Sequence, residues 1–332
     1  MVGIDKLHIT TREFKLMESN EYTPHYNKPP GSEIIETHKR YHDPTGLIQS
    51  SINHKGLVIQ INPSAMIRTI KGEPINYLAT TKEDIETATE LTLTHIESIG
   101  VRLPEQSLMD ITRIDYAKDM ETDHPAMEYF PALAILGGKR LKPRNEPTTY
   151  YFANKQRQFC MYDKGLEVYD KTNGNKQLEG NITRFECRYL KTKEVQKTCN
   201  LRNLKEFMAT TPEQWQHFYS TQLKEQVFRT DNNEPIPITL TMKQQQRIVD
   251  YFGGNRNFEQ IIMKSALLEY YGTRERMIQH LKHIGMKRSG IGKKLRQCET
   301  ALKQKGIIES YRNKETTATL LNELITKFTK VA

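Results

Sequence analysis

Short strand-like segments joined by short links fill most of the first 230 residues, and this pattern limits the fold more than any other feature. Two of these segments, 150–153 and 158–162, flank a turn at 154–157 and predict a β-hairpin. Links this short favour antiparallel neighbours, because parallel strands need a crossover of a dozen or more residues. We therefore predict a mainly antiparallel sheet. Its other expected strands are 6–9, 56–61, 111–118 and 183–190.

The pattern changes at Thr241, where apolar residues take up helical spacing and β alternation stops. A linker is expected over 231–237, which reads Asp-Asn-Asn-Glu-Pro-Ile-Pro. The predicted fold class is therefore α+β: an antiparallel-sheet domain with flanking helices over 1–230, then a mostly helical domain over 240–332. The expected helices are 241–252, 257–271, 273–283, 290–304, 315–329 and, in the first domain, 81–100, with Thr81 as N-cap and Gly100 at its end.

The two parts of the chain differ sharply in charge. Residues 241–332 contain 18 Lys and Arg against 8 Asp and Glu, whereas residues 1–240 contain 31 against 32. The net charge of the whole chain, +9, therefore comes from the helical part. A neutral body with a basic appendage favours a polyanionic partner, most simply nucleic acid. The alternative is a solvated basic helical surface without such a partner.

Two of the expected strands carry acidic residues inside an apolar alternation. Asp115 shares a strand face with Arg113, and Glu186 shares one with Arg184 and Arg188. A charged side chain in such a strand costs free energy unless it is paired or bound to a metal. Two interpretations stay open for each acid: an ion pair with its arginine on a solvated sheet face, or a catalytic role.

A segment between these strands, Met161-Tyr-Asp-Lys-Gly-Leu-Glu167, adds a tyrosine, a lysine and further carboxylates. Mg²⁺ and Mn²⁺ prefer carboxylate oxygens, and such ions assist phosphoryl transfer. Tyr162 is the candidate nucleophile, although a phenol with a pKa of about 10 needs a nearby cation or base. Lys164 would share its face if the strand continued, and Glu167 could turn back toward a metal after Gly165. The alternatives are a core tyrosine and an ordinary surface turn.

Three short motifs, in this order and spacing, resemble those of the rolling-circle replication initiators of filamentous phages, the gene-two protein family. They are Arg113–Asp115, Tyr162–Glu167 and Arg184–Glu186. They are more distantly similar to motifs of the initiators of small staphylococcal plasmids. The resemblance covers about residues 111–190 and extends to the basic helical end. It implies that Tyr162 joins covalently to the nicked 5′ phosphate and that the metal ligands are Asp115, Glu186 and either Glu167 or Asp163.

The resemblance implies a site-specific DNA endonuclease that nicks one strand of a double-stranded origin. Attack by Tyr162 would leave a free 3′ hydroxyl for synthesis and a 5′-phosphotyrosyl bond, and the reverse transfer would close a single-stranded circle. No nucleotide cofactor is needed, because the covalent bond conserves the energy of the phosphodiester. The expected cofactor is Mg²⁺ or Mn²⁺. The expected partners are origin duplex, single-stranded DNA, a host helicase and a host polymerase, and homodimer formation stays open.

Further basic residues are candidate phosphate contacts. On the sheet they are Arg113, Arg184 and Arg188. In an expected loop over 137–144 they are Lys139, Arg140, Lys142 and Arg144. In 286–296, glycines and a serine precede a helix whose N-terminus favours phosphate, and the candidates are Lys287, Arg288, Lys293, Lys294 and Arg296. A short strand at 307–311 would give this part a winged-helix character.

The sequence lacks the features of several other protein classes. No apolar run reaches the roughly 18–20 residues that cross a bilayer, and the first residues show no signal-peptide pattern, so we expect a cytoplasmic protein without a membrane partner. The resemblance implies that the cytoplasm is that of a bacterial host cell. The cysteines form no CxxC pair and the histidines no His-x-His pair, against a thiolate zinc site and the paired-histidine nicking enzymes. Tyr311 lacks the setting of a tyrosine recombinase. Two rivals stay open: a DNA-binding regulator without activity, and a metal-dependent nuclease that uses water.

Overall fold

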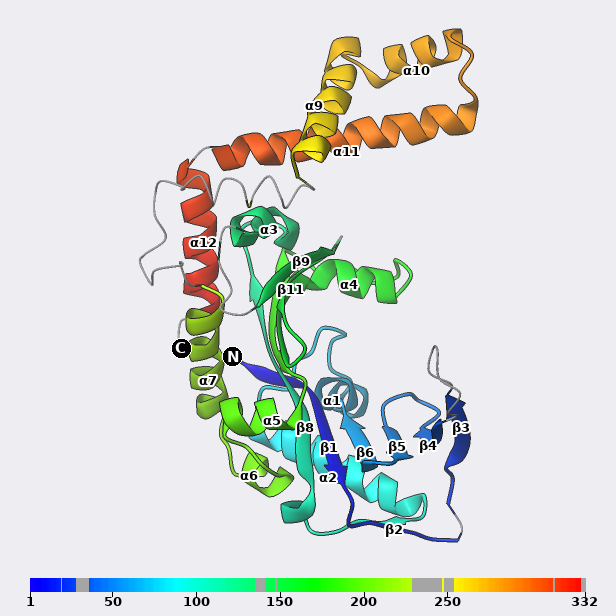
Figure 1. Cartoon of the computed structure of the whole chain (residues 1–332), viewed down its shortest axis with the longest axis vertical. Coiled ribbons are helices and arrows are strands. Elements are labelled where there is room, and N and C mark those ends of the chain that lie inside the picture. Colours follow the sequence, from blue (N-terminus) through cyan, green and yellow to red (C-terminus); the bar gives the residue numbers. More distant parts are fainter. Residues whose placement is uncertain are drawn as a thin grey trace. The chain divides into compact units, whose positions relative to one another are not determined.

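The computed structural model of the chain describes residues 1–18, 20–27, 36–134, 136, 141–146, 148–228, 247, 254–312 and 314–329. Over these residues the fold is α+β, as the sequence predicts, with an antiparallel sheet and helices (Figure 1). The chain divides into two compact units. The sheet unit holds residues 1–126, 138–228 and 326–332, and the helical unit holds 127–137 and 229–325. No described helix is long and apolar enough to span a membrane.

The described strands of the sheet unit form one ten-stranded antiparallel sheet, in the order β3-β4-β5-β6-β1-β8-β12-β11-β10-β9. β1 and β8 lie side by side near its middle (Figure 1). All six predicted strands are confirmed. The strands are β1 Gly3–Thr11, β3 Thr23–Asn27, β4 Glu36–His42, β5 Gln49–Asn53, β6 Gly56–Ile61, β8 Asp110–Glu121, β9 Lys142–Glu146, β10 Thr149–Ala153, β11 Arg157–Asp163 and β12 Ile182–Tyr189, with a separate pair β2 Lys15–Leu16 and β7 Val101–Arg102.

The β10–β11 hairpin forms where the sequence predicts it. The amide of Asn154 donates to the carbonyl of Arg157 at 2.9 Å, which closes the turn. One expectation in this region is wrong: Lys142 and Arg144 do not lie in a loop. They belong to β9, which pairs with β10 and forms the edge of the sheet. Charged residues suit such an edge strand because they discourage pairing with another chain.

One face of the central strands is apolar and covered by helices. On β12, Phe185, Cys187 and Tyr189 point to this face and are buried. The hydroxyl of Tyr219 on α7 (Pro212–Gln226) donates to the carbonyl of Phe185 at 3.0 Å. The ring of Phe328, near the end of the chain, lies 5.6 Å from that of Phe185. Burying a side chain of this size stabilises the fold by about 1.5–3 kcal/mol, so this layer anchors the sheet.

The other face of the same strands is polar, as the alternation on β12 predicts. Register sets Arg188 opposite Asp115 of β8, and Tyr162 of β11 opposite Arg184. Residues opposite each other in an antiparallel pair point to the same side of the sheet. The ionisable residues of separate strands therefore gather on one surface.

The remaining helices of the sheet unit connect and cover its strands. α2 (Lys82–Ser98) is the helix predicted over 81–100, and the side chain of Thr81 accepts a hydrogen bond from the amide of Asp84 at 3.2 Å. Gly100 follows it with a φ of 90°, a conformation that favours glycine. The others are α1 Pro63–Lys71, a 3₁₀ turn Gln106–Leu108, α4 Lys164–Lys171, α5 Thr192–Glu194, a π turn Val195–Cys199 and α6 Leu204–Met208.

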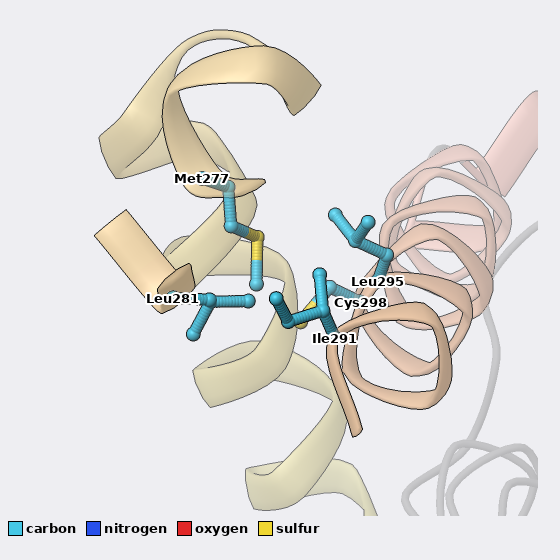
Figure 2. Packing of buried hydrophobic residues seen from close by; sticks show 5 residues of the cluster. All are labelled: Met277, Leu281, Ile291, Leu295 and Cys298. Atoms are coloured by element: carbon cyan, nitrogen blue, oxygen red, sulfur yellow. The ribbon is translucent and has the colours of Figure 1, made fainter. Parts of the chain in front are cut away.

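The helical unit has its own core. α10 (Arg274–His283) places Met277 and Leu281 against Ile291, Leu295 and Cys298 of α11 (Arg288–Arg312) (Figure 2). Leu267, Leu268 and Tyr271 of α9 (Gly254–Tyr271) pack against the same cluster. In α3 (Ala126–Ala134), the hydroxyl of Tyr129 donates to Glu323 of α12 (Lys314–Thr329) at 2.7 Å.

Four of the predicted C-terminal helices are confirmed, but two details are wrong. Residues 307–311 belong to α11 rather than to a strand, so the winged-helix character is not present in the described residues. α11 also begins at Arg288, so Ser289 and Gly290 lie inside the helix rather than before it. The expected linker at 231–237 and helix at 241–252 lie outside the described residues, apart from Arg247.

Candidate functional site

Three carboxylates from three neighbouring strands meet on the polar face of the sheet. Asp5 lies on β1, Asp115 on β8 and Glu186 on β12, and one oxygen of each lies within 4.8 Å of the others. Asp115 and Glu186 are buried, and Asp5 is partly buried. The register of β8 between β1 and β12 brings together residues that are distant in the sequence. The convergence of Asp115 and Glu186 that the motifs suggest is therefore present.

Asp5 is a member of the cluster that the sequence motifs did not identify. The pairing of β1 with β8 is irregular between Ile4 and Lys6, and Lys6 rather than Asp5 stands opposite Asp115. A bulge of this kind redirects the side chain of the extra residue. The same signal that marks Asp115 was available, because Asp5 is an acid within the apolar alternation of its strand.

Two of the acids also pair with the arginines that the sequence suggests. The guanidinium of Arg113 donates to both oxygens of Asp115, at 2.9 and 2.5 Å. The Nε of Arg188 donates to Glu186 at 2.6 Å. The same two carboxylates therefore form ion pairs with arginines and belong to the acid cluster. The arginines compensate for part of the negative charge that the fold buries.

Burial and the neighbouring charges move the pKa values of the three acids in different directions. Burial raises the pKa of Asp115 to about 6, although Arg113 opposes the rise. Burial and the negative charge of Glu186 raise the pKa of Asp5. Burial also acts on Glu186, but Arg188 and Arg184 outweigh it and lower the pKa of that carboxyl. Glu186 is thus an anion, while Asp5 and Asp115 hold their protons more strongly than usual, chiefly because burial disfavours the charged form of each.

Tyr162 points into this cluster. Its hydroxyl donates to Glu186 at 2.5 Å, and its side chain is nearly buried, with 8% of the residue exposed. Burial, followed by the charge of Glu186, raises the pKa of the phenol well above its ordinary value, and Arg184 opposes this. The hydroxyl is therefore protonated at rest, with a carboxylate placed to accept its proton.

Arg184 has a different role from the DNA contact that the sequence suggests. Only 2% of it is exposed, and its guanidinium donates to Asp119 at 2.5 and 2.7 Å and to Asp5 at 2.9 Å. Its donors are thus directed at two carboxylates within the protein. It is the cation that orders Asp5 beside the cluster, rather than a group free to bind phosphate.

The segment after Tyr162 does not continue as a strand. Asp163 caps α4 by accepting from the amide of Leu166 at 2.8 Å, so Lys164 begins a helix. Glu167 accepts from Lys164 and from Lys171, each at 2.6 Å, and does not belong to the acid cluster. Neither Glu167 nor Asp163, the third ligand that the resemblance implies, belongs to the acid cluster, and the third carboxylate there is that of Asp5. An Asp directly before a helical stretch is a capping signal that the sequence contained.

A cavity of about 380 Å³ opens beside Tyr162 and two members of the cluster, while Asp115 is not part of its lining. Asp5, Tyr162 and Glu186 line it from the sheet, and the basic side chains around it exceed the acidic ones in number. The positive charge of the lining thus attracts an anion of the size of a phosphate group toward Tyr162. The basic side chains of the lining are Lys6, Arg68, Lys164, Lys171, Arg184 and Arg188.

The acid cluster fits a divalent cation by its chemistry. Three carboxylates offer the hard oxygen ligands that Mg²⁺ and Mn²⁺ prefer. Burial raises the pKa values of Asp5 and Asp115, and a bound cation would favour their ionised forms. Asp5, Asp115 and Glu186 are therefore the residues that would hold such an ion.

Addition of Mn²⁺ to the metal-free protein is expected to raise its melting temperature, because binding to the folded state alone stabilises it by about 2.7 kcal/mol at one hundred times the dissociation constant. Asp115→Asn should lose most of this shift. Glu167→Gln should keep it, since that carboxylate pairs with lysines outside the cluster. Differential scanning calorimetry of the three proteins makes the comparison. Equal shifts in Asp115→Asn and the parent would exclude Asp115 as a ligand.

The other predicted DNA contacts lie in separate places. On β9, Arg144 pairs with Glu146 and lies 4.3 Å from the ring centre of Tyr151, and Lys142 is exposed beside it. Lys139 and Arg140 lie outside the described residues. In the helical unit, Lys287 lies just before α11, Arg288 is the first residue of that helix, and Lys294 lies within it. Lys293 and Arg296 border, with Lys264 of α9, a cavity of about 320 Å³.

Comparison with models of known protein families gives no match to this chain, and comparison with curated proteins gives no similar sequence.

Proposed function

We propose that this chain is a metal-dependent DNA-nicking and joining enzyme that uses Tyr162 as its nucleophile and initiates rolling-circle replication. One observation carries the proposal: the Tyr162 hydroxyl donates to Glu186, a member of a three-carboxylate cluster, inside a cavity with a basic lining. A nucleophile, a proton acceptor and a donor set for a divalent cation thus lie in contact. The replication role rests on the resemblance of the motifs to the phage initiators.

The reaction follows from the placement of these groups. Glu186 accepts the proton of the phenol as the oxygen of Tyr162 bonds to phosphorus. The bond from phosphorus to the 3′ oxygen breaks, and that oxygen takes up a proton and leaves as a free 3′ hydroxyl. A bound Mg²⁺ or Mn²⁺ would neutralise phosphate charge as it develops. One phosphate ester replaces another, so the reverse attack by a 3′ hydroxyl restores the DNA strand without an added energy source.

The cations near Tyr162 serve different parts of this step. Arg184 opposes the rise in the pKa of the phenol, and so favours loss of its proton. Arg188 keeps Glu186 ionised, which is the state that can accept the proton. Lys6 lines the same cavity, and its side chain makes no hydrogen bond or ion pair within the described part of the chain, so its ammonium group is available to a phosphate oxygen.

Recognition of the duplex is assigned to the helical unit in this proposal. Lys293, Lys294 and Arg296 lie in α11, and Lys287 just before it, in a part of the chain with a strong basic excess. Such side chains bind phosphate regardless of sequence and raise the rate of encounter. A host helicase and a host polymerase would then act on the nicked duplex.

The proposal predicts that supercoiled plasmids carrying the origin are nicked in Mg²⁺ or Mn²⁺, and that a 5′-linked protein–DNA adduct accumulates. Tyr162→Phe should remove both products completely, because a phenyl ring has no oxygen to bond to phosphorus. Tyr169→Phe is the matched control, since Tyr169 is an exposed tyrosine on the adjoining α4. Agarose gels report nicked circles, and denaturing gels report the adduct.

Two other outcomes of this experiment would replace the proposal. Nicking that survives Tyr162→Phe without an adduct would identify a nuclease that uses water. Tight binding of the plasmids without cleavage in either metal would identify a DNA-binding regulator. The DNA-binding regulator has one observation in its favour. Asp115 and Glu186 already have arginine partners, and purely structural charges in a sheet are held in the same way.

A further inference from the structure

A second, larger cavity opens at the end of the sheet beyond the acid cluster. Its volume is about 970 Å³. It is built where β1 and β12 end and β8 begins, next to the hairpin between β5 and β6. All of these elements belong to the sheet unit. We call this cavity the strand-end groove. Its lining includes Thr10, Thr11, Arg12, Asn53, Lys55, Ser107, Thr112, Arg113, Lys191 and Thr192.

The lining of the strand-end groove is rich in side chains that can donate hydrogen bonds. Beside a few apolar residues it contains five hydroxyl side chains, the amide of Asn53 and four cations, and such donors bind the sugar-phosphate backbone of DNA. Arg12, Lys55 and Lys191 are exposed. Within the described residues, none of the three makes an ion pair or a side-chain hydrogen bond. The acids of the lining, Glu13 and Asp110, are fewer than these cations.

The position of Lys55 is set by the backbone. Gly56, the next residue, has a φ of 115°, and a Cβ there would come within 2.3 Å of the carbonyl oxygen of Thr11. Only glycine therefore lets the tip of the β5–β6 hairpin lie this close to the end of β1. The close approach holds Lys55 at the rim of the groove, beside Arg12.

The groove and the acid cluster are connected through one residue. Arg113 lines the groove, and its guanidinium binds both oxygens of Asp115 in the cluster. Arg184, opposite Tyr162, and Leu190, in the groove, are six positions apart along β12, or about 20 Å at roughly 3.3 Å per residue. About six stacked nucleotides at 3.4 Å each, or fewer in an extended strand, would bridge that distance.

We infer that the strand-end groove binds the backbone of single-stranded DNA on one side of the phosphate that Tyr162 attacks. The inference rests on the proposed function, because it assigns a path to the substrate of that site. The described lining contains no tyrosine, tryptophan or phenylalanine, and its one aromatic ring is the imidazole of His8, so contacts to phosphate outnumber those available for base stacking. Binding in the groove therefore depends on phosphate charge and tolerates any base sequence.

The test uses the full chain with Tyr162→Phe, in a chelator, and a fluorescently labelled twelve-nucleotide single strand of mixed sequence. Lys55→Glu with Lys191→Glu should weaken binding by roughly tenfold at low salt. It should also reduce the slope of log affinity against log salt by about 1.4, since each lost phosphate contact contributes about 0.7 on a single strand. Anisotropy titrations at several salt concentrations measure both quantities.

Lys205→Glu with Lys224→Glu is the matched control, because these exposed lysines on α6 and α7 lie outside the groove and change the net charge equally. Equal effects of the two double variants, or no effect of the groove pair, would overturn the inference. A four-nucleotide strand should bind more weakly than the longer one and respond less to the groove substitutions. Since cleavage is not needed here, failure of the nicking assay with the parent protein would refute the proposed function alone.

Discussion

Replacement of Glu186 by glutamine is expected to lower the rate of DNA nicking by about 10²- to 10⁴-fold, the usual contribution of a positioned proton acceptor. The amide keeps the shape of the side chain but cannot take the proton of Tyr162, which lies 2.5 Å away. It also removes one of the three oxygen anions of the metal cluster. Single-turnover cleavage of a supercoiled plasmid, followed by adduct formation on denaturing gels, measures the effect.

Glu167→Gln is the control for Glu186→Gln. Both carboxylates line the same cavity, yet Glu167 binds Lys164 and Lys171 and lies outside the cluster. We expect it to change nicking only a few-fold. Glu186→Asp, which keeps the charge, should be more active than Glu186→Gln. If Glu186→Gln cleaved as fast as Glu167→Gln, Glu186 would be neither the proton acceptor nor an essential ligand. Circular dichroism confirms that each variant is folded before rates are compared.

Replacement of Arg184 by methionine is expected to lower the free energy of unfolding by about 3–5 kcal/mol, the usual cost of removing one partner from a buried ion pair. Arg184 is almost fully buried, and its loss leaves Asp119 and Asp5 without their shared cation. The single tryptophan, Trp215 on α7, is buried in the sheet unit and reports its unfolding. Urea titrations followed by Trp215 fluorescence give the stability of each variant.

Arg144→Met serves as the matched control for Arg184→Met. Arg144 also pairs with a carboxylate, Glu146, but its side chain is 54% exposed on the edge strand β9. An exposed pair of this kind contributes about 0–1 kcal/mol. Adding Asp119→Asn to Arg184→Met should recover part of the lost stability, because one uncompensated charge disappears. Equal losses for the two arginine variants would show that the buried network does not stabilise the sheet.

Local patterns were sufficient to predict much of this structure. The alternation of Arg184, Glu186 and Arg188 with Phe185 and Cys187 is a property of neighbouring residues, and a strand of period two sends the two sets to opposite faces. The hairpin before Tyr162 and the helix after Thr81 are likewise determined by residues close in the sequence. Predictions of this kind were confirmed because these elements form without contacts between residues that are distant in the sequence.

Predictions that depended on continuing or ending an element were less successful. Lys164 would have shared the face of Tyr162 if the strand had continued, but the capping hydrogen bond of Asp163 starts a helix there. Residues 307–311 were expected to form a short strand, yet they lie within α11. In the first place a local capping signal decides the structure, and in the second the helix continues beyond its predicted end at residue 304.

The sequence by itself determined that acids would lie within the strands of an antiparallel sheet, and that Tyr162 would precede a Lys and a Glu. Only the tertiary structure decided which acids meet. Asp5 enters the cluster through an irregular pairing of β1 with β8, while Glu167 turns away to its lysines. The physical reason is that side-chain alternation is a local property, whereas the register between distant strands is set by the packing of the whole sheet.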